Sequence, residues 1–255
     1  MRHIFIPDTQ VKPGTPTEHL IAAGNYIASK RPDVIIHAGD HWDMPSLSSY
    51  EKKGSKYFEG KRIKEDIDSG NEAMHLLTKP IFDEMKRIRK NKKKAWQPRM
   101  VFTMGNHENR INRFIHENPQ HEGMIGTQDL DLTGWEVYDY QVPVVINGIV
   151  YCHNFVNPDS LVGGVVTGTI ENKLNKLKRS FCCGHQQRRQ FGQTYDALGK
   201  ELIGLVAGRF YQHEEHYLGP QKQTDWSGIV VKNQVSDGTY DPMFVGMKYL
   251  MENYL

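Results

Sequence analysis

Five short apolar runs in this chain each stop at a side chain that can bind a metal ion. In layered α/β folds, ligands bind just beyond the carboxyl ends of the strands. If these runs are strands, they bring carboxylate, amide and imidazole groups to one edge of a sheet. Such a mixed set of donors suits divalent Mn, Fe, Zn, Ni or Co. The side chains at the five ends are Asp8, Asp40, Asn106 with His107, His153 and His185.

Asp40 is the expected bridging ligand, because a carboxylate has two oxygens and can bind two cations at once. Asn106, His153 and His185 would complete the ligands of one ion. A second ion would use Asp8 together with Asp40. Two metals ~3.5–4 Å apart make a clamp that activates a water and holds phosphate oxygens during phosphoryl transfer.

His107 follows Asn106 directly, so it can approach a substrate without itself binding the metal. That position suits a general acid for a leaving alkoxide. Either Asp43 or Glu108 would orient an imidazole from behind. His41, which lies inside the Asp40 motif, is an alternative metal ligand.

The runs that carry these residues predict strands over 3–6, 34–36, 100–102, 149–152 and 181–183. Between the first two, Thr15-Pro16-Thr17-Glu18 predicts a capping box and a helix that ends near Lys30, which makes a βαβ unit. Asn147-Gly148 predicts a hairpin between 142–145 and 149–152. Further strands over 202–206, 226–232 and near 243–245 suggest an antiparallel half. One α/β domain over residues 1–255 follows.

Residues 44–98 interrupt this pattern as a predicted basic helical insertion. Apolar side chains recur there at helical spacing, and Pro80 is expected to kink or break the helix. Residues 51–99 contain 15 Lys and Arg against 8 Asp and Glu, a net of +7 in a chain whose total is +2, so the remainder is −5. The apolar side is expected to pack on the core; an oligomer interface or a partner-docking arm is the alternative.

Several arginines and lysines lie where a phosphate could reach them. Residues 86–94 form a strongly basic helix end, which is either a solvated terminus that suits the helix dipole or a contact for nucleic acid. Arg110 and Arg113 are candidate substrate ligands, and surface pairing with acidic neighbours is their alternative. Arg188 and Arg189 follow the last strand end.

The composition is that of an ordinary globular protein, with 38% hydrophobic and 24% charged residues. No apolar run approaches the ~20 residues that span a bilayer, and no signal-peptide pattern opens the chain. We therefore expect a cytoplasmic protein without membrane contact. Three cysteines, two of them adjacent in a predicted strand, indicate core residues instead of a disulfide framework.

At this point the motifs resemble those of the calcineurin-like metallophosphoesterases. The resemblance covers roughly residues 3–190 and implies a four-layer α/β/β/α sandwich with mixed sheets and two metal ions between them. It also implies hydrolysis of phosphomonoesters or diesters by metal-activated water, with Asp40 as the bridge, Asn106, His153 and His185 on one metal and His107 as the acid. The matching segments are Asp8-x-Gln10, Gly39-Asp40-x-x-Asp43, Gly105-Asn106-His107-Glu108, His153 and Gly184-His185-x-Gln187.

Two positions depart from the family pattern, which has histidine where this chain has Gln10 and Gln187. Both fall among the ligands expected at the first metal position, with Asp8 and Asp40. An amide oxygen still binds a cation, but such a set favours Mg, Mn or Ca over Zn. The position would then be weak, filled only with substrate, or empty, and a Gln10–Gln187 hydrogen bond in place of the ion is also open.

These residues favour a divalent-metal-dependent phosphoesterase that acts on nucleic acid or nucleotide phosphodiesters. A phosphomonoesterase acting on small molecules or phosphoproteins is the main variant. A non-enzymatic metal- or phosphate-binding module is the rival, because the two glutamines weaken one metal position. The expected cofactor is one or two divalent ions, with Mn preferred and Mg, Ni, Zn, Fe and Ca as alternatives.

Overall fold

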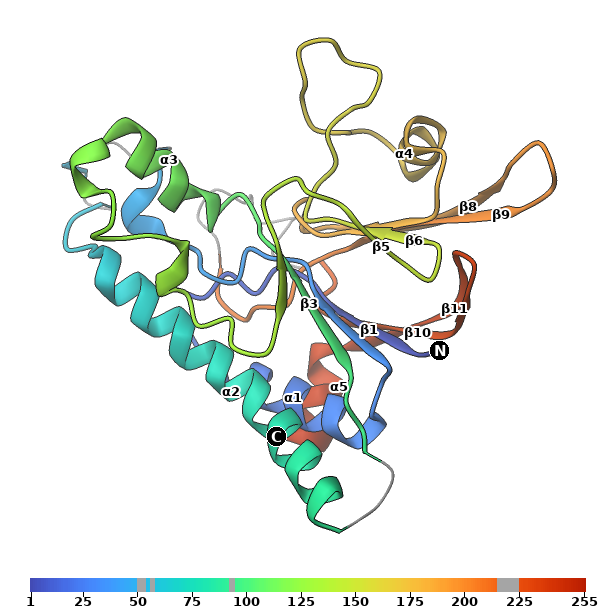
Figure 1. The fold of residues 1–255 in the computed structure, drawn as a ribbon, viewed down its shortest axis with the longest axis horizontal. Coiled ribbons are helices and arrows are strands. Elements are labelled where there is room, and N and C mark those ends of the chain that lie inside the picture. The colour runs from blue at the N-terminus through green and yellow to red at the C-terminus, as the bar shows by residue number, and fades with distance from the viewer. Residues whose placement is uncertain (50–53, 56–57, 92–94, 215–224) are drawn as a thin grey trace.

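The structure, a computed structural model, describes residues 1–49, 54–55, 58–91, 95–214 and 225–255, and it contains two mixed β-sheets (Figure 1). The six-stranded sheet has the order β11 (Thr239–Gly246), β10 (Gly228–Ser236), β1 (His3–Ile6), β2 (Val34–His37), β3 (Arg99–Thr103), β4 (Glu136–Tyr138). The five-stranded sheet has the order β5 (Val144–Ile146), β6 (Ile149–Tyr151), β7 (Phe181–Cys183), β9 (Glu201–Ala207), β8 (Arg189–Tyr195). The predicted α/β class is confirmed.

Each sheet has a parallel centre. Strands β1 to β4 run parallel, whereas β10 and β11 are antiparallel to their neighbours. In the second sheet β6, β7 and β9 are parallel, and β5 and β8 pair antiparallel at the edges. The carboxyl ends of the parallel strands carry the loops in which the candidate residues lie.

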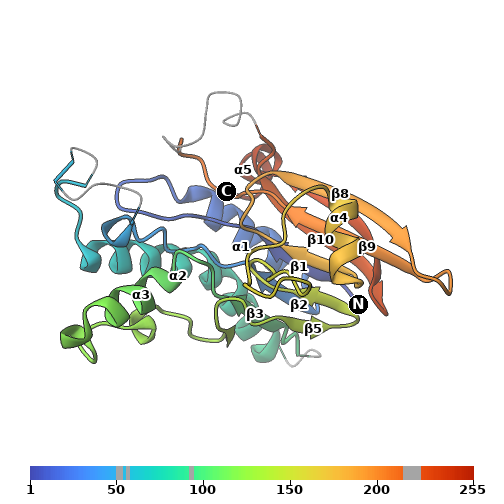
Figure 2. The ribbon, with the colours of Figure 1, turned by 90° about the horizontal axis from the view of Figure 1, so that it is seen from above.

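Five α-helices occur in the described residues: α1 (Glu18–Lys30), α2 (Ile63–Lys90), α3 (Asn109–Glu117), α4 (Ile170–Leu177) and α5 (Met247–Tyr254). Short 3₁₀ turns cover Pro45–Leu47, Pro119–His121 and Thr127–Asp129. In both views α3 lies at the end of the molecule remote from the N-terminus (Figures 1 and 2). No helix in the described ranges combines the length and the apolarity that crossing a membrane requires.

Three apolar clusters hold these elements together. Helices α1, α2 and α5 pack on the six-stranded sheet, the two sheets pack on each other, and α4 packs on the five-stranded sheet. Strand β1 shows how one strand serves two clusters, since Ile4 and Ile6 belong to the first and Phe5 to the second. Successive side chains of a strand point to opposite faces, so a strand covered on both sides reads as a continuous apolar run.

Helix α2 corrects the prediction of a break at Pro80. It runs unbroken from residue 63 to 90. Gly24 of α1 meets it there, because a Cβ on Gly24 would lie 2.4 Å from the carbonyl oxygen of Leu77 and 3.1 Å from the proline ring. The apolar side of α2, which includes Met74 and Ile81, belongs to the main core, as the default reading of this helix predicted. Residues 92–94 of the basic run lie outside the described residues.

Two local predictions have opposite outcomes. The capping box is wrong: α1 begins at Glu18, its N-cap Thr17 makes no side-chain bond, and the Thr15 hydroxyl donates to the carbonyl of Lys12 at 2.7 Å. The hairpin is confirmed, because Asn147 and Gly148 have φ values of 50° and 84° between β5 and β6. Both central residues of this turn type need positive φ, which asparagine and glycine tolerate.

Candidate metal centre

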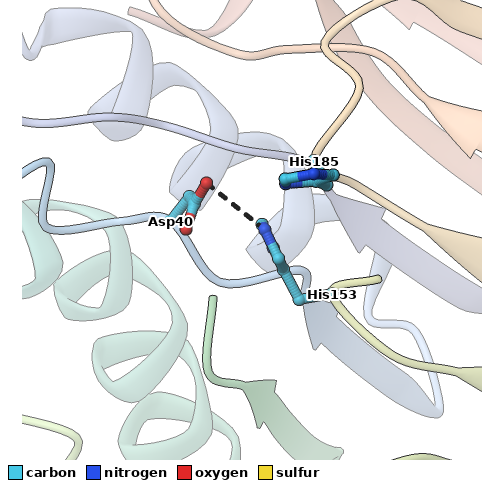
Figure 3. Close-up of side chains that lie close together, drawn as sticks. All are labelled: Asp40, His153 and His185. Atoms are coloured by element: carbon cyan, nitrogen blue, oxygen red, sulfur yellow. Dashed lines mark ion pairs between the residues drawn. The ribbon is translucent and has the colours of Figure 1, made fainter. Parts of the chain in front are cut away.

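Four of the predicted ligands converge on one point. Asp40 follows β2, Asn106 follows β3, His153 follows β6 and His185 follows β7. Ligand atoms of Asp40, His153 and His185 all lie within 4.8 Å of one another, and Figure 3 shows the three side chains facing each other. The Asn106 Oδ1 atom lies 3.0 Å from His153 Nε2 and 2.8 Å from His185 Nδ1.

The ring of His153 is oriented for metal binding. Its Nδ1 lies 2.8 Å from the carbonyl oxygen of Ala38, which can only accept, so Nδ1 carries the proton in the neutral ring. The lone pair of Nε2 then points toward Asp40 Oδ2, 3.3 Å away. A histidine that binds a metal through one ring nitrogen usually donates a hydrogen bond to a carbonyl or carboxylate through the other.

The loops around this point are tightly bent. Four residues there have a left-handed backbone without being glycine, namely Gln10, Asp40, His185 and Gln187, with φ values between 40° and 67°. Non-glycine residues in this region are uncommon, and such conformations cluster at functional sites. Gly105 shows why its motif starts with glycine: a Cβ there would lie 2.0 Å from Asp40 Oδ1.

Glu108 joins two of these loops. Its buried carboxylate accepts hydrogen bonds from the backbone nitrogens of Asp40, His41, Trp42 and Gly105 at 2.6–3.0 Å. Within the described residues no imidazole hydrogen-bonds to it, so it is Asp43 that orients one. Sequence reasoning had left that choice open.

His107 and Asp43 form a pair beside the ligands. The Nδ1 atom of His107 lies 2.6 Å from Asp43 Oδ1, and its Nε2 lies 3.7 Å from Asp40 Oδ2. The guanidinium of Arg110 is buried there, with Nη2 3.2 Å from His107 Nε2 and Nη1 donating to the carbonyl of Asp43 at 2.7 Å. Arg113 is exposed on α3 and donates to the hydroxyl of Ser49. Of the two predicted arginines, only Arg110 therefore lies against the candidate catalytic pair.

The charges of these groups depend on one another. Burial opposes protonation of His153, but Asp40 outweighs it and raises the His153 pKa to about 9. Burial also opposes ionisation of Asp40, yet His107 and His153 lower its pKa. For His185, burial prevails and lowers the pKa to about 4. Burial raises the pKa of Asp8 to about 7, helped by the charge of Asp40.

The loops that follow the parallel strands form a rim, and the side of this rim that carries Gln10 and Gln187 is built differently. The backbone nitrogen of His185 donates to both carboxylate oxygens of Asp8 at 3.0 Å. Gln187 Oε1 accepts a hydrogen bond from the hydroxyl of Tyr211, whereas neither amide atom of the buried Gln10 has a hydrogen-bond partner among the residues that the structure describes. The alternative of a Gln10–Gln187 hydrogen bond is therefore wrong.

His41 is also not the substitute ligand. Its Nδ1 lies 2.7 Å from the hydroxyl of Thr9 and its Nε2 lies 2.9 Å from the carbonyl oxygen of Gly70 in α2. Both ring nitrogens thus make hydrogen bonds inside the protein, and neither is left for a metal ion. His41 joins the Asp40 loop to α2.

Tyr211 is a residue of this site that sequence reasoning missed. It lies beyond the end of β9, which pairs parallel with β7 and antiparallel with β8. The apolar run of β9 does not stop at a metal-binding side chain, because Gly208, Arg209 and Phe210 separate it from Tyr211. The sequence predicts that the strand over 202–206 belongs to an antiparallel half, so the parallel pairing of its end with β7 is found only in the structure.

Comparisons with known proteins give little beyond this geometry. No protein-family model matches the chain. A stretch of 82 residues is 32% identical to the "Gene 54 protein" of Mycobacterium phage D29. The match covers 32% of this chain and 31% of that protein, so the chain spans about a third of the length of this relative.

Proposed function

We propose that the protein is a divalent-metal-dependent phosphoesterase related to the calcineurin-like family. The observation that carries the proposal is the meeting of two groups at one rim: the donors Asp40, Asn106, His153 and His185, and the His107–Asp43 pair beside them. The donor set of one carboxylate, one amide oxygen and two imidazoles fits a divalent transition ion, with Mn our first choice. The paired sheets with helices outside agree with the four-layer α/β/β/α sandwich of that family.

The chain's own groups have distinct tasks in this proposal. A bound divalent ion would supply Lewis-acid activation of water and of the phosphoryl oxygens. His107, held by Asp43, faces the same space through Nε2 and would give a proton to the leaving oxygen. Arg110, whose Nη2 lies 3.2 Å from that nitrogen, would bind a phosphate oxygen.

For the substrate we favour phosphodiesters of nucleic acid or nucleotides, with phosphomonoesters as the variant. The support is the basic character of the end of α2, with Arg87, Arg89 and Lys90 in its last turn. This end precedes the start of β3, so it lies away from the carboxyl ends that carry the site (Figure 1), and it would contact a long polyanion at a distance from the hydrolysed bond. Arg189 contributes less than its sequence position suggests, because its guanidinium stacks on the rings of Trp226 and Phe244 at 4.7 and 4.6 Å. A cytoplasmic location remains our expectation.

The first experiment is hydrolysis of bis-p-nitrophenyl phosphate and p-nitrophenyl phosphate by metal-free protein reloaded with Mn²⁺. We expect turnover with the diester ahead of the monoester, and none for His185→Ala. His116→Ala, which removes an exposed histidine of α3, is the matched control and should keep full activity. Activity retained by His185→Ala would refute the assignment. A nucleic-acid substrate would show a steep salt dependence, because phosphate contacts release counterions.

A further inference from the structure

The rim has two halves that share Asp40. The nitrogen half consists of Asn106, His153 and His185, and the oxygen half consists of Asp8 and Gln10. We propose that the oxygen half is a cation position of a different class, which takes hard ions such as Mg²⁺, Mn²⁺ or Ca²⁺ and discriminates against Zn²⁺ and Ni²⁺. The inference rests on the proposed function in that both ions would serve one phosphoester site.

Asp8 and Asp40 supply the negative charge of the oxygen half. Both are almost completely buried, with exposed fractions of 0% and 1%. Their loops are joined directly, since the backbone nitrogens of Thr9 and Gln10 donate to the carbonyl oxygen of Asp40 at 3.2 and 2.8 Å. Two carboxylates out of water repel each other and lose hydration, and a cation between them offsets both effects.

Gln10 is the second, independent observation. Its side chain is completely buried, and within the described ranges of the chain neither its amide oxygen nor its amide nitrogen has a hydrogen-bond partner. A buried polar group without a partner destabilises the folded protein, so such a group calls for an unseen ligand or another explanation. A cation beside Asp8 and Asp40 that binds the amide oxygen accounts for the unpaired oxygen of Gln10.

Among the described residues, no imidazole joins Asp8 and Asp40 in a group of possible metal ligands. In the described part of the chain, the group of metal-binding side chains within 4.8 Å of one another contains His153 and His185 but not Asp8. The oxygen of Gln187 is held by the hydroxyl of Tyr211, which is itself 3% exposed. Oxygen donors alone suit Mg²⁺, Ca²⁺ and Mn²⁺, whereas Zn²⁺ gains most from nitrogen and sulfur ligands.

The test counts metal ions instead of measuring turnover. Metal-free protein is dialysed against Zn²⁺ and analysed for bound metal, and the Zn-loaded protein is then titrated with Mn²⁺ by electron paramagnetic resonance. We expect one Zn²⁺ per chain and one further, weaker Mn²⁺, which Mg²⁺ or Ca²⁺ displaces while Zn²⁺ stays bound.

Substitutions assign the ions to the two halves. Gln10→His should raise the Zn²⁺ count to two, and histidine is among the residues that tolerate the left-handed backbone at this position (φ 40°). Gln193→His, at an exposed position of β8, should leave the count at one. Asp8→Asn, which keeps one acceptor for the His185 nitrogen, should lose the Mn²⁺ and keep the Zn²⁺.

Two results would overturn the inference. One is a wild-type protein that binds two Zn²⁺ ions with similar affinity. The other is a Zn-loaded protein that takes up no Mn²⁺, Mg²⁺ or Ca²⁺ at roughly 10 mM, beyond the range of weak calcium modules. Expected metal counts in a protein that hydrolyses no phosphoester would instead overturn the proposed function and leave the two classes of position standing.

Discussion

The buried histidines of this protein fall into two regions where the pKa shifts in opposite directions. At the rim, carboxylates outweigh burial and raise the pKa of the buried His107 and His153, whereas burial prevails at the half-buried His185 and lowers its pKa. In the core and beneath the rim, burial prevails and lowers the pKa of His3 and His41 to about 4. His37 follows the second pattern, with its pKa well below the ordinary value.

The difference shows what carboxylate neighbours do in a buried place. His3 has neutral partners, the hydroxyl of Tyr151 at 2.8 Å and the amide oxygen of Asn147 at 3.0 Å, so it connects two sheets as an uncharged ring. At the rim Asp40 stabilises positive charge on its neighbours, and a metal ion is positive charge too. A proton and a metal ion would therefore compete for the same ring nitrogens at the rim, whereas the hydrogen-bond partners of His3 in the core favour neither.

The largest effect should come from Asp40→Asn, which removes the carboxylate that raises the pKa of His153 and so makes the rim differ from the core. We expect loss of the tightly bound metal and a fall in diester hydrolysis of roughly 10³-fold or more, equal to about 4 kcal/mol of transition-state stabilisation. The pKa of His153 should also fall, so that this rim histidine titrates like a core one. Nitrogen-15 NMR of the metal-free variant measures that pKa, and a His153 that stays charged above pH 7 would break the comparison.

His107→Gln should have the next largest effect on activity. Loss of a general acid lowers kcat by about 10²–10⁴-fold, and the metal content should not change because His107 is not a proposed ligand. Asp43→Asn should lower kcat less, since the ring stays in place and loses only its orienting partner at 2.6 Å. Elemental analysis beside steady-state kinetics separates the two effects. Metal lost from His107→Gln would place this residue among the ligands.

The core histidines should make the protein sensitive to acid. The unfolded chain takes up a proton near pH 6.5, but folded His3 does so only near pH 4. Stability is therefore complete above pH 6.5 and is lost as the pH falls toward 4, by up to about 3 kcal/mol for this one residue. Urea unfolding at pH 7.5 and pH 5 measures the loss. His3→Gln should lower stability at pH 7.5 but flatten the pH dependence, and an unchanged slope would contradict the assignment.

The smallest effects distinguish the two arginines. Arg113→Ala removes an exposed side chain whose bond to Ser49 lies on the surface, and KM should stay within about twofold. Arg110→Ala removes a buried group beside His107 and should raise KM for either substrate by about tenfold, since charged hydrogen bonds contribute about 1.5–3 kcal/mol. If the two substitutions changed KM equally, Arg110 would not be distinguished from Arg113 as a substrate ligand.

Much of the rim could be predicted because a strand buried on both faces leaves a clear signal. Each apolar run ended at its candidate ligand, and the expected strand ends brought Asp40, Asn106, His153 and His185 together. The Asn147-Gly148 turn could be predicted equally well, because few dipeptides tolerate positive φ at both positions. Residue type and short-range spacing determine these features.

Other features depend on contacts between distant segments. Glu108 was a candidate to orient a ring, but four backbone nitrogens from two loops select its role. Pro80 remains inside a helix because α2 packs on Gly24 of α1, and tertiary packing there overrides the local preference. From its place in the sequence His41 is a candidate ligand, but in the structure Thr9 and Gly70 are hydrogen-bond partners for both of its ring nitrogens. No local pattern carries such information.

The four hydrogen bonds of Glu108 have a consequence for how the proposed metal ion would be acquired. They fix the loops after β2 and β3 with groups of the chain alone. The part of the proposed ligand cage that comes from these two loops would thus be assembled during folding, and metal loading would be a later step that requires little rearrangement there. Such a protein can lose its ion to a chelator and recover it without refolding, in contrast to zinc fingers, which are unfolded without their metal.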